Sequence, residues 1–570
     1  MRMKAIETAF RLRRACPRRM RPTLRSLWLA LLLALGLASP AAARDQLVIG
    51  MTQYPSTLHP SIDAMLAKSY LHGLTRRPFT VYDTDWKLVC LLCTELPTFE
   101  NGKAVRETLP DGGEGVAVTY SIQPNATWGD GTPVTTEDVL FTYEAGRNAA
   151  TGISNAELYR RILKIDVIDD KRFTMHLDRI EFTYNGLGDF NILPAHLERE
   201  ALEDPANYRT RTRYDSDPAN PGLYFGPYRI AGITPGAEIR LEANPTWWGK
   251  PPPVERIILK VIENTAALEA NLLSGSIDYV AGELGLSIDQ ALAFEKRHAA
   301  DYDFLYKAGL FYEHIALNLD NPILKSRAVR QALLTAIDRD AINAQLFGGK
   351  QAIADTSVSP LDAGYDKATH RYGYDPAAAA ALLDGAGWTL GDDGIRRNAA
   401  GDKLSLELVT TAGDRNRELV QQVLQAEWRK IGIETRLRAE PARILFGETL
   451  PQRKFEMGLF AFLSSPENVP RTTLHSTMIP TAANGGDGQN YTGFSSAEMD
   501  ELLDRLEVEL DPARRLQLWR RLQEIYASEL PVLPLWFRAQ PFIMPKWLTG
   551  IVPTGNQFPT TLWVEDWNVR

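Results

Sequence analysis

The chain has 570 residues and a formal net charge of −8. This length exceeds what one hydrophobic core normally supports and predicts two or more lobes. Residues 1–43 hold nine basic residues and one acidic residue, so the remainder carries a charge near −16. A chain this acidic has no electrostatic reason to bind nucleic acid, and we exclude nucleic acid as a partner.

Residues 1–43 have the pattern of a secretory signal. A basic segment precedes twelve largely apolar residues at 27–38, and Ala41-Ala42-Ala43 supplies the small residues that signal peptidase prefers. Twelve residues are too few to span a bilayer, which takes about 20. We therefore expect cleavage after Ala43 and export of a chain without a membrane span, with an uncleaved anchor as the less favoured alternative. The pattern does not distinguish Sec from Tat export.

The three cysteines leave several interpretations open. Cys16 lies in the signal segment, whereas Cys90 and Cys93 form a C-L-L-C motif. One such pair without a second pair or a nearby histidine is a weak metal signal, and redox catalysis requires a thioredoxin-like context. Buried free thiols are the favoured interpretation, followed by a small local disulfide and then by metal or redox chemistry.

The first elements after the signal are a strand at 46–50 and a loop with the sequence Y-P-S-T-L-H-P at 54–60. A second, alternating strand at 118–122 leads into Trp128-Gly129-Asp130-Gly131, a turn that needs the freedom of glycine at positive φ. Thr135 and Asp138 have the spacing of a helix-capping box, so a helix is predicted to begin just before Val139.

Capping residues also predict the later helices. Gly275 is placed to end one helix in the left-handed conformation, before a strand at 277–280. Ser326 precedes a helix with one apolar face, and Asp375-Pro376 is an N-cap followed by proline in the first turn. A helix at 415–430 leads to a strand at 433–437, and capping residues at 495–498 and 511–512 begin the last two helices.

Several of these segments resemble the motifs of one family in the same order. W-G-D-G-T-P-V-T-T-E-D-V at 128–139 closely resembles the signature of family 5 extracellular solute-binding proteins, the receptors of ABC importers. Four further segments resemble the family pattern: G-P-Y-R-I at 226–230, L-L-S-G-S-I-D at 272–278, V-R-Q-A-L at 329–333 with A-I-D-R at 336–339, and L-P-V-L-P-L at 530–535. The resemblance covers about residues 47–570.

This resemblance implies a two-lobe α/β periplasmic-binding-protein fold (type II, cluster C-like) with an extra subdomain in the first lobe. The expected boundaries are 44–313 for lobe I, including an inserted subdomain at about 75–204, 314–525 for lobe II, and 526–570 for a C-terminal return to lobe I. Such a protein is periplasmic and monomeric, binds a peptide or peptide-like solute between its lobes, and delivers it to ABC permease subunits in the inner membrane. The alternatives are a receptor for a non-peptide solute (an opine, a sugar or an aromatic compound) and a binding or chaperone-like protein not coupled to transport.

The sequence contains no motif of a known catalytic centre. There is no Walker A motif, no H-E-x-x-H and no G-x-S-x-G, and the eight histidines show no metal-ligand spacing. Pairs of neighbouring carboxylates are explained by turns and helix caps. We therefore predict no enzymatic activity, no catalytic residue, no metal site and no cofactor.

A binding cleft needs mostly apolar walls with a few fixed polar groups. The resemblance places the 54–60 loop and the segments that cross between the lobes beside the cleft. The candidate ligand-binding residues are therefore Tyr54, Thr57, His59, Phe311, Tyr312, Thr411, Phe460, Phe462, Ser464 and Tyr491. For each aromatic residue, packing in the core is the competing interpretation.

Two positions depart from the family pattern. Dipeptide receptors of this family hold the amino group of the ligand with an aspartate and its carboxylate with an arginine, and the matching positions here are Phe462 and Thr411. A buried charge without its partner costs on the order of several kcal/mol. We therefore hypothesise that the site takes a longer peptide held by main-chain contacts, or an uncharged or aromatic non-peptide. With an offset alignment, Arg415 or Arg417 would supply the missing positive charge.

Overall fold

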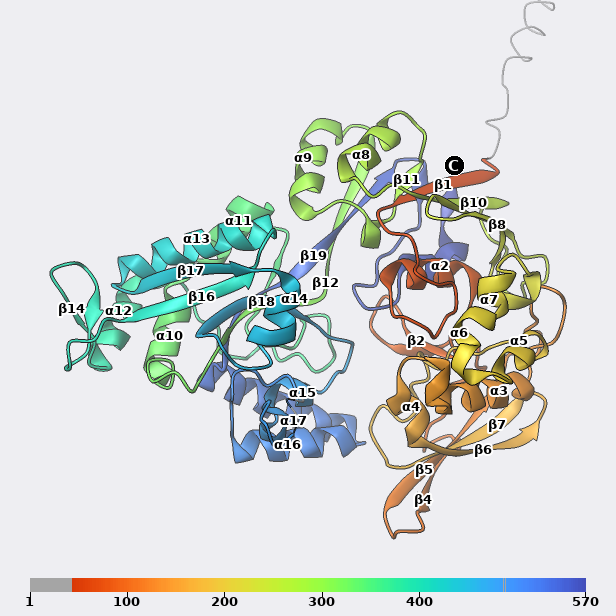
Figure 1. Ribbon diagram of the computed structural model, residues 1–570, viewed down its shortest axis with the longest axis horizontal. Helices are drawn as coiled ribbons and strands as arrows, with labels where there is room; N and C mark the ends of the chain where they lie inside the picture. The colour runs from red at the N-terminus through yellow and green to blue at the C-terminus, as the bar shows by residue number, and fades with distance from the viewer. Residues whose placement is uncertain (1–43, 485, 487, 570) are drawn as a thin grey trace, which may run out of the picture. The chain divides into compact units, whose positions relative to one another are not determined.

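An eleven-stranded mixed sheet organises the computed structural model, which describes residues 44–569 except 485 and 487 (Figure 1). The strand order is β17-β16-β18-β12-β19-β11-β1-β10-β9-β8, and β13 pairs with β19 off this path. The strands are β1 (Gln46–Met51), β8 (Tyr228–Thr234), β9 (Glu238–Ala243), β10 (Arg256–Val261), β11 (Tyr279–Val280), β12 (Tyr302–Leu317), β13 (Ala352–Ile353), β16 (Ser405–Thr411), β17 (Glu434–Glu440), β18 (Met457–Leu463) and β19 (Val532–Pro545).

The predictions for residues 1–43, including the signal peptide and Cys16, lie outside the described residues. Within the described part, no helix combines the length and apolar character needed to cross a membrane.

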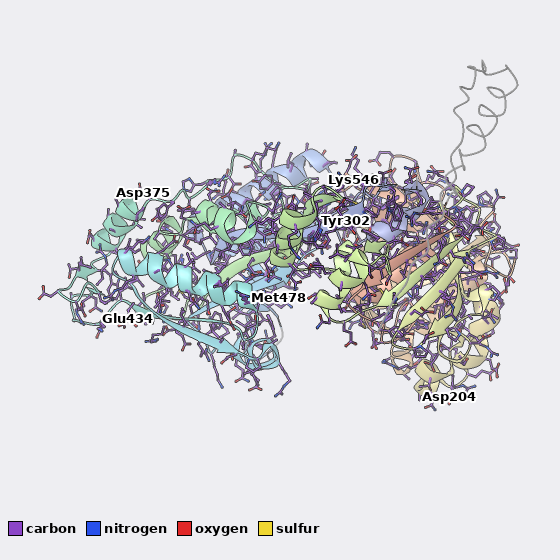
Figure 2. The ribbon with its side chains drawn as sticks, turned by 90° about the horizontal axis from the view of Figure 1, so that it is seen from above. Asp204, Tyr302, Asp375, Glu434, Met478 and Lys546 are labelled. Atoms are coloured by element: carbon purple, nitrogen blue, oxygen red, sulfur yellow. A yellow bond between two sulfur atoms is a disulfide. The ribbon has the colours of Figure 1, made fainter. Side chains whose placement is uncertain are left out.

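The long antiparallel pair β12 and β19 joins the two halves of this sheet. The pairing runs from Tyr302 opposite Pro545 to Ala316 opposite Val532, with two register shifts. Figure 2 labels Tyr302, the first residue of β12, and Lys546, the residue after the end of β19, beside each other. The first half contains β1 in parallel pairing with β10 and β11, and the second contains β16 in parallel pairing with β17 and β18.

The two halves of the sheet pack against separate apolar cores. In the first half β1 buries Leu47, Ile49 and Met51 completely, as expected for alternate positions on one face of a strand. These residues pack with α2 (Leu66–Thr75) and with the strands β8 to β10. In the second half, α10 (Arg327–Thr335), α12 (Pro376–Gly385) and α13 (Arg415–Lys430) contribute to one core, while α16 (Ala497–Val508) and α17 (Pro512–Glu529) contribute to another.

The predicted helix caps are largely confirmed. The side chains of Asp375 and Asp511 accept backbone N–H groups at the starts of α12 and α17, and α13 has the predicted bounds. The start of α16 is capped by Ser496, which accepts from the Met499 N–H. Ser326 precedes α10 as predicted, but its side chain makes no capping hydrogen bond.

A smaller sheet, with strand order β4-β5-β7-β6, lies between β1 and β8 in the sequence. Its strands are β4 (Ala104–Thr108), β5 (Glu114–Ser121), β6 (Ile162–Asp169) and β7 (Arg172–Leu177). Helix α3 (Thr136–Arg147) lies between β5 and β6 in the sequence. The remaining elements are α4 (Ala156–Arg161), α5 (Ala195–Leu202), α6 (Tyr208–Arg211), α7 (Arg213–Ser216), α8 (Thr265–Leu273), α9 (Ile288–His298), α11 (Arg339–Phe347), α14 (Ala442–Ile444), α15 (Arg471–Leu474), β2 (Thr80–Tyr82), β3 (Leu88–Cys90), β14 (Thr389–Leu390), β15 (Arg396–Arg397), β20 (Leu548–Thr549) and β21 (Asn568–Val569).

The W-G-D-G-T-P segment builds the start of α3. Gly131 has a φ of 91°, and the capping box between Thr135 and Asp138 is formed as predicted. The indole N–H of the fully buried Trp128 donates to the same Asp138 carboxylate at 3.1 Å, and the Ala195 N–H donates to its other oxygen. These contacts make the segment a structural element of the smaller unit.

Cys90 and Cys93 are joined by a disulfide. The sequence favoured free thiols, and that prediction is wrong. The sequence pattern could not decide the question, because a short C-L-L-C loop closes only if the chain turns between the two residues. Here β3 ends at Cys90, and Cys93 forms an isolated bridge with Ile122.

The disulfide predicts the outcome of a labelling experiment on the chain without residues 1–43. Under denaturing conditions without reductant, neither Cys90 nor Cys93 should react with iodoacetamide, and both should react after reduction. Intact-mass spectrometry measures the difference. Labelling of both residues before reduction would contradict the disulfide.

Candidate ligand-binding site

Two pockets lie on opposite faces of β12. Successive residues of a strand point to opposite faces. Tyr312, His314 and Ala316 accordingly line one pocket, which we call the aromatic pocket. Phe311 and Glu313 line the other, which we call the charged pocket.

The neighbouring strand extends the aromatic face. β18 pairs with β12 so that Phe462 lies opposite Tyr312 and Phe460 lies opposite His314. The chain that follows the carboxyl end of β18, including Ser464, then borders the same pocket. Ligands of open α/β sheets commonly bind just beyond the carboxyl ends of strands, and this pocket has that position.

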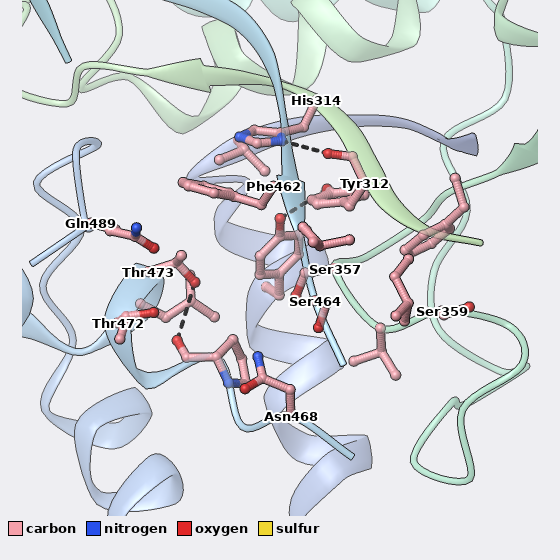
Figure 3. Close-up of a pocket in the computed structure, with 18 of the residues that line it drawn as sticks. Tyr312, His314, Ser357, Ser359, Phe462, Ser464, Asn468, Thr472, Thr473 and Gln489 are labelled. Carbon is pink, nitrogen blue, oxygen red and sulfur yellow. Dashed lines mark hydrogen bonds between the residues drawn. The ribbon is translucent and has the colours of Figure 1, made fainter. Parts of the chain in front are cut away.

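Aromatic rings form most of the wall of this pocket. The imidazole of His314 stacks between its neighbours, with ring centroids 5.0 Å from both Tyr312 and Phe462 (Figure 3). Phe460 meets the imidazole edge to face at 4.6 Å, and Tyr491 stacks on Phe462 at 6.2 Å. The wall is completed by Trp86, Trp519, Tyr526 and Phe537.

His314 is neutral and holds its proton on Nδ1. Burial lowers its pKa to about 4. Its Nδ1 lies 3.1 Å from the Tyr312 carbonyl oxygen, which can only accept, so Nδ1 must be the donor (Figure 3). Nε2 is therefore an acceptor, and it has no hydrogen-bond partner among the described residues.

The rest of the lining is polar but almost uncharged. Its hydroxyl and amide side chains come from Ser357, Ser359, Ser464, Ser465, Asn468, Thr472, Thr473, Gln489 and Thr492. Among the described lining residues the only ionisable carboxylate is Asp362, which accepts the Gly364 N–H at 2.8 Å and the Glu467 N–H at 2.6 Å. Burial raises the pKa of Asp362. Among the described lining residues the pocket therefore presents one carboxylate, and no cationic side chain, to a charged ligand group.

The charged pocket is organised by one buried carboxylate. Glu313 accepts from the Nε of Arg417 and the Nε of Arg538, both at 2.6 Å, and is almost fully buried. Burial by itself would raise the pKa of Glu313, but the two guanidinium groups hold it below its ordinary value. The ion pairs tie β12 to both α13 and β19.

The two pockets differ in size. The aromatic pocket has free space of about 90 Å³, whereas the charged pocket has about 530 Å³. The smaller volume exceeds that of several waters, since one water needs roughly 10–15 Å³ on this measure. It suits one ring-sized group and not a whole oligopeptide.

The structure brings together half of the candidate residues. Tyr312, Phe460, Phe462, Ser464 and Tyr491 line the aromatic pocket.

Phe311 faces away from them and lines the charged pocket. Thr411 is buried at the end of β16 and accepts a hydrogen bond from Arg417 at 2.8 Å. Because Arg417 is already paired with Glu313, it is not a free clamp for a ligand carboxylate.

The structure does not bring Tyr54, Thr57 or His59 to either pocket. His59 is fully buried, and Tyr208 and Tyr214 meet its ring edge to face. The Thr57 hydroxyl accepts the His59 N–H, and Tyr54 packs against the core of the first half of the sheet. The core interpretation therefore describes Tyr54 and His59 better than the ligand-contact interpretation.

Sequence reasoning missed several lining residues. His314 had a usable signal, because it lies two positions after Tyr312 in a strand and so shares its face. Trp86, Asp362 and Gln489 come from segments distant in sequence and carry no local signal. In the described part of the chain, no cluster of three or more His, Cys, Asp or Glu residues is arranged to hold a metal.

Comparison with known proteins identifies the class to which this fold and site belong. The family model described as bacterial extracellular solute-binding proteins, family 5, matches residues 113–480. The match covers more than half of the chain, and the chain belongs to this family. Its architecture is the two-lobe type II α/β fold of solute-binding proteins.

Most of the chain aligns with known relatives. The oligopeptide-binding protein AppA of Bacillus subtilis is 25% identical over 458 residues, covering 78% of this chain and 80% of the relative. The oligopeptide-binding protein from Thermus thermophilus, solved in complex with a pentapeptide, is 27% identical with a TM-score of 0.68, covering 92% of this chain and 96% of that one. NikZ from Campylobacter jejuni, solved in complex with Ni(L-His), is 21% identical with a TM-score of 0.68, covering 92% and 99%, and shows the shared fold alone.

The Glu313 ion pairs predict a large stability difference between two otherwise similar substitutions. Glu313→Gln should lower the free energy of unfolding by about 2–3 kcal/mol, because it leaves Arg417 and Arg538 without their buried partner. Glu498→Gln removes an exposed pair with Arg521 and should change stability by less than about 0.5 kcal/mol. Urea unfolding measures both, and equal effects would contradict the proposed importance of the buried carboxylate.

The buried, neutral His314 predicts acid sensitivity. An unfolded histidine takes up a proton near its ordinary pKa of about 6.5, whereas the folded side chain does so only near 4. Protonation therefore favours the unfolded state as the pH falls from 6.5 towards 4. From His314 alone, the free energy of unfolding should be about 2–3 kcal/mol lower at pH 4.5 than at pH 7.

Comparison of wild type with His314→Gln isolates this effect, because burial also lowers the pKa of His59 and His72 in both proteins. Urea unfolding at pH 7 and at pH 4.5 measures the free energy of unfolding, and its decrease between the two pH values should be smaller for the variant than for wild type. The same loss in both proteins would contradict the assignment.

Proposed function

We propose that this protein captures a peptide or peptide-like solute in the periplasm and delivers it to the permease subunits of an ABC importer. The observation that carries this proposal is the aromatic pocket, a mostly apolar site just beyond the carboxyl end of β18, whose described lining holds one carboxylate and no cationic side chain. Membership of the solute-binding family and relatives named as oligopeptide-binding proteins support it. The function is binding and delivery rather than catalysis.

The two separately packed halves of the sheet support the proposed lobe organisation. We place lobe I at 44–313 with the smaller unit as its inserted subdomain, lobe II at 314–525, and the return to lobe I at 526–570. Strands β12 and β19 are the proposed hinge, since they are the long pair shared by both halves. Closure of the lobes around the solute would present a surface to the permease. Export through a cleaved signal and action as a monomer complete the proposal.

The ligand is a peptide longer than a dipeptide, of which one group enters the aromatic pocket, and its ends make no ionic contacts there. Phe462 and Thr411 are uncharged, Asp362 is occupied by backbone N–H groups, and Arg417 is paired with Glu313. A carboxylate buried there would lose its hydration without gaining a cationic partner, and an ammonium group would gain only a carboxylate that already accepts two backbone N–H groups. The charged ends must therefore lie outside this pocket.

The proposal predicts binding preferences of the exported protein in isothermal titration calorimetry. Members of a mixed tetra- to hexapeptide library should bind with dissociation constants in the micromolar range or tighter, and Ala-Ala should not. Acetylated and amidated versions of a bound peptide should retain affinity within about threefold, because no charge holds the ends.

Two results would oppose the proposal in different ways. Micromolar binding of Ala-Ala would show that charged anchors exist. Failure of every peptide to bind would favour a non-peptide solute.

A further inference from the structure

The aromatic pocket contains a hydrogen-bond acceptor that the protein does not satisfy. His314 is fully buried, its single proton is donated to the Tyr312 carbonyl, and Nε2 has no donor among the described residues. Buried polar groups are nearly always paired, so such an exception calls for a physical explanation. A donor supplied by a ligand would remove the penalty of the unpaired acceptor once the side chains that cover Nε2 move to admit it.

The lining contains donors that are engaged with other groups. The hydroxyl groups of Tyr312 and Tyr526 lie 2.9 Å apart, and one donates to the other. The Trp86 indole N–H donates to the Thr554 carbonyl at 2.8 Å. In Figure 3, the free nitrogen of His314 lies on the side of the ring away from Tyr312.

The surroundings select a neutral aromatic group. The rings of Tyr312, Phe460, Phe462 and Tyr491 offer faces and edges on which another ring can stack. A carboxylate has no proton to donate and would find no cationic side chain in the described lining. An ammonium group would find only Asp362, both of whose oxygens already accept backbone N–H groups. The free space of about 90 Å³ accommodates one ring-sized group.

Resting on the proposed peptide-binding function, we propose that the aromatic pocket is a side-chain subsite for a tyrosine or tryptophan of the bound peptide. The phenol hydroxyl or indole N–H donates to Nε2 of His314, while Phe462 and Tyr491 contact the ring. His314 is thereby the residue that distinguishes a donor-bearing ring from phenylalanine. Phe462, at the position where dipeptide receptors carry a charged anchor, provides a stacking surface.

The test compares peptides that differ only in one ring substituent. Four pentapeptides with blocked ends carry tyrosine, phenylalanine, O-methyltyrosine or alanine at the central position. The tyrosine peptide should bind about five- to tenfold more tightly than the phenylalanine peptide, since one hydrogen bond to an otherwise unpaired buried group is gained. The O-methyltyrosine peptide lacks the donor and should bind no better than phenylalanine, and the alanine peptide should bind most weakly.

Variants assign the preference to His314. His314→Phe keeps a ring but removes the acceptor, so the tyrosine-to-phenylalanine ratio should fall to about one while the phenylalanine peptide still binds. His314→Gln restores an acceptor and should recover part of the ratio. His370→Phe changes an exposed histidine that does not line the pocket and should keep the wild-type ratio. Circular dichroism melting checks that each variant is folded.

The possible outcomes separate the subsite from the proposed function. Equal binding of tyrosine and O-methyltyrosine peptides by the wild type, or a preference that survives His314→Phe, overturns the subsite and leaves peptide binding intact. If His314→Phe does not fold, the O-methyltyrosine comparison on the wild type decides alone.

If no pentapeptide binds, the peptide function fails, and thermal shift with N-acetyltyrosinamide and N-acetylphenylalaninamide tests the subsite by itself. Stabilisation by the tyrosine compound alone supports it, and equal or no stabilisation by the two compounds overturns it.

Discussion

The pairing of β12 with β19 is the constraint on which the rest of this structure depends. The two strands hold together both halves of the large sheet, and the strict alternation of side chains along β12 separates two chemically different pockets. Glu313 on one face is fixed by Arg417 and Arg538, while His314 on the other lies among aromatic rings. A register shift of one residue would exchange these two environments.

The contrast between the pockets follows from the cost of burying charge. The carboxylate of Glu313 is almost fully buried, and it is stabilised there by the two guanidinium groups that contact it. The aromatic pocket avoids that cost by having almost no ionisable groups, and its one histidine is held neutral by burial. A ligand carboxylate that entered the aromatic pocket would meet that cost, because the described lining offers it no cationic side chain.

The motif that identifies the family and the residues that bound the pocket have different physical roles. Trp128, Gly131 and Asp138 form a turn, a helix cap and a buried hydrogen bond within the smaller unit, and none of them lines the aromatic pocket. Local structure of this kind depends on neighbours in the sequence, which explains why it could be predicted. Phe462 and Tyr491 were predicted as site residues from the resemblance, whereas His314 and Trp86 were missed because their relation to the pocket depends on strand pairing and on distant segments.

The amino-acid sequence by itself determined the family, the two-lobe α/β architecture, and most helix starts, because capping residues and family motifs act over a few positions. It also indicated that the charged anchors of dipeptide receptors are absent at Phe462 and Thr411. Only the tertiary structure decided that Cys90 and Cys93 are joined, that His59 is a core residue, and that Phe311 and Tyr312 face different pockets. These outcomes depend on turns, packing and strand pairing between segments far apart in the chain, which no local pattern records.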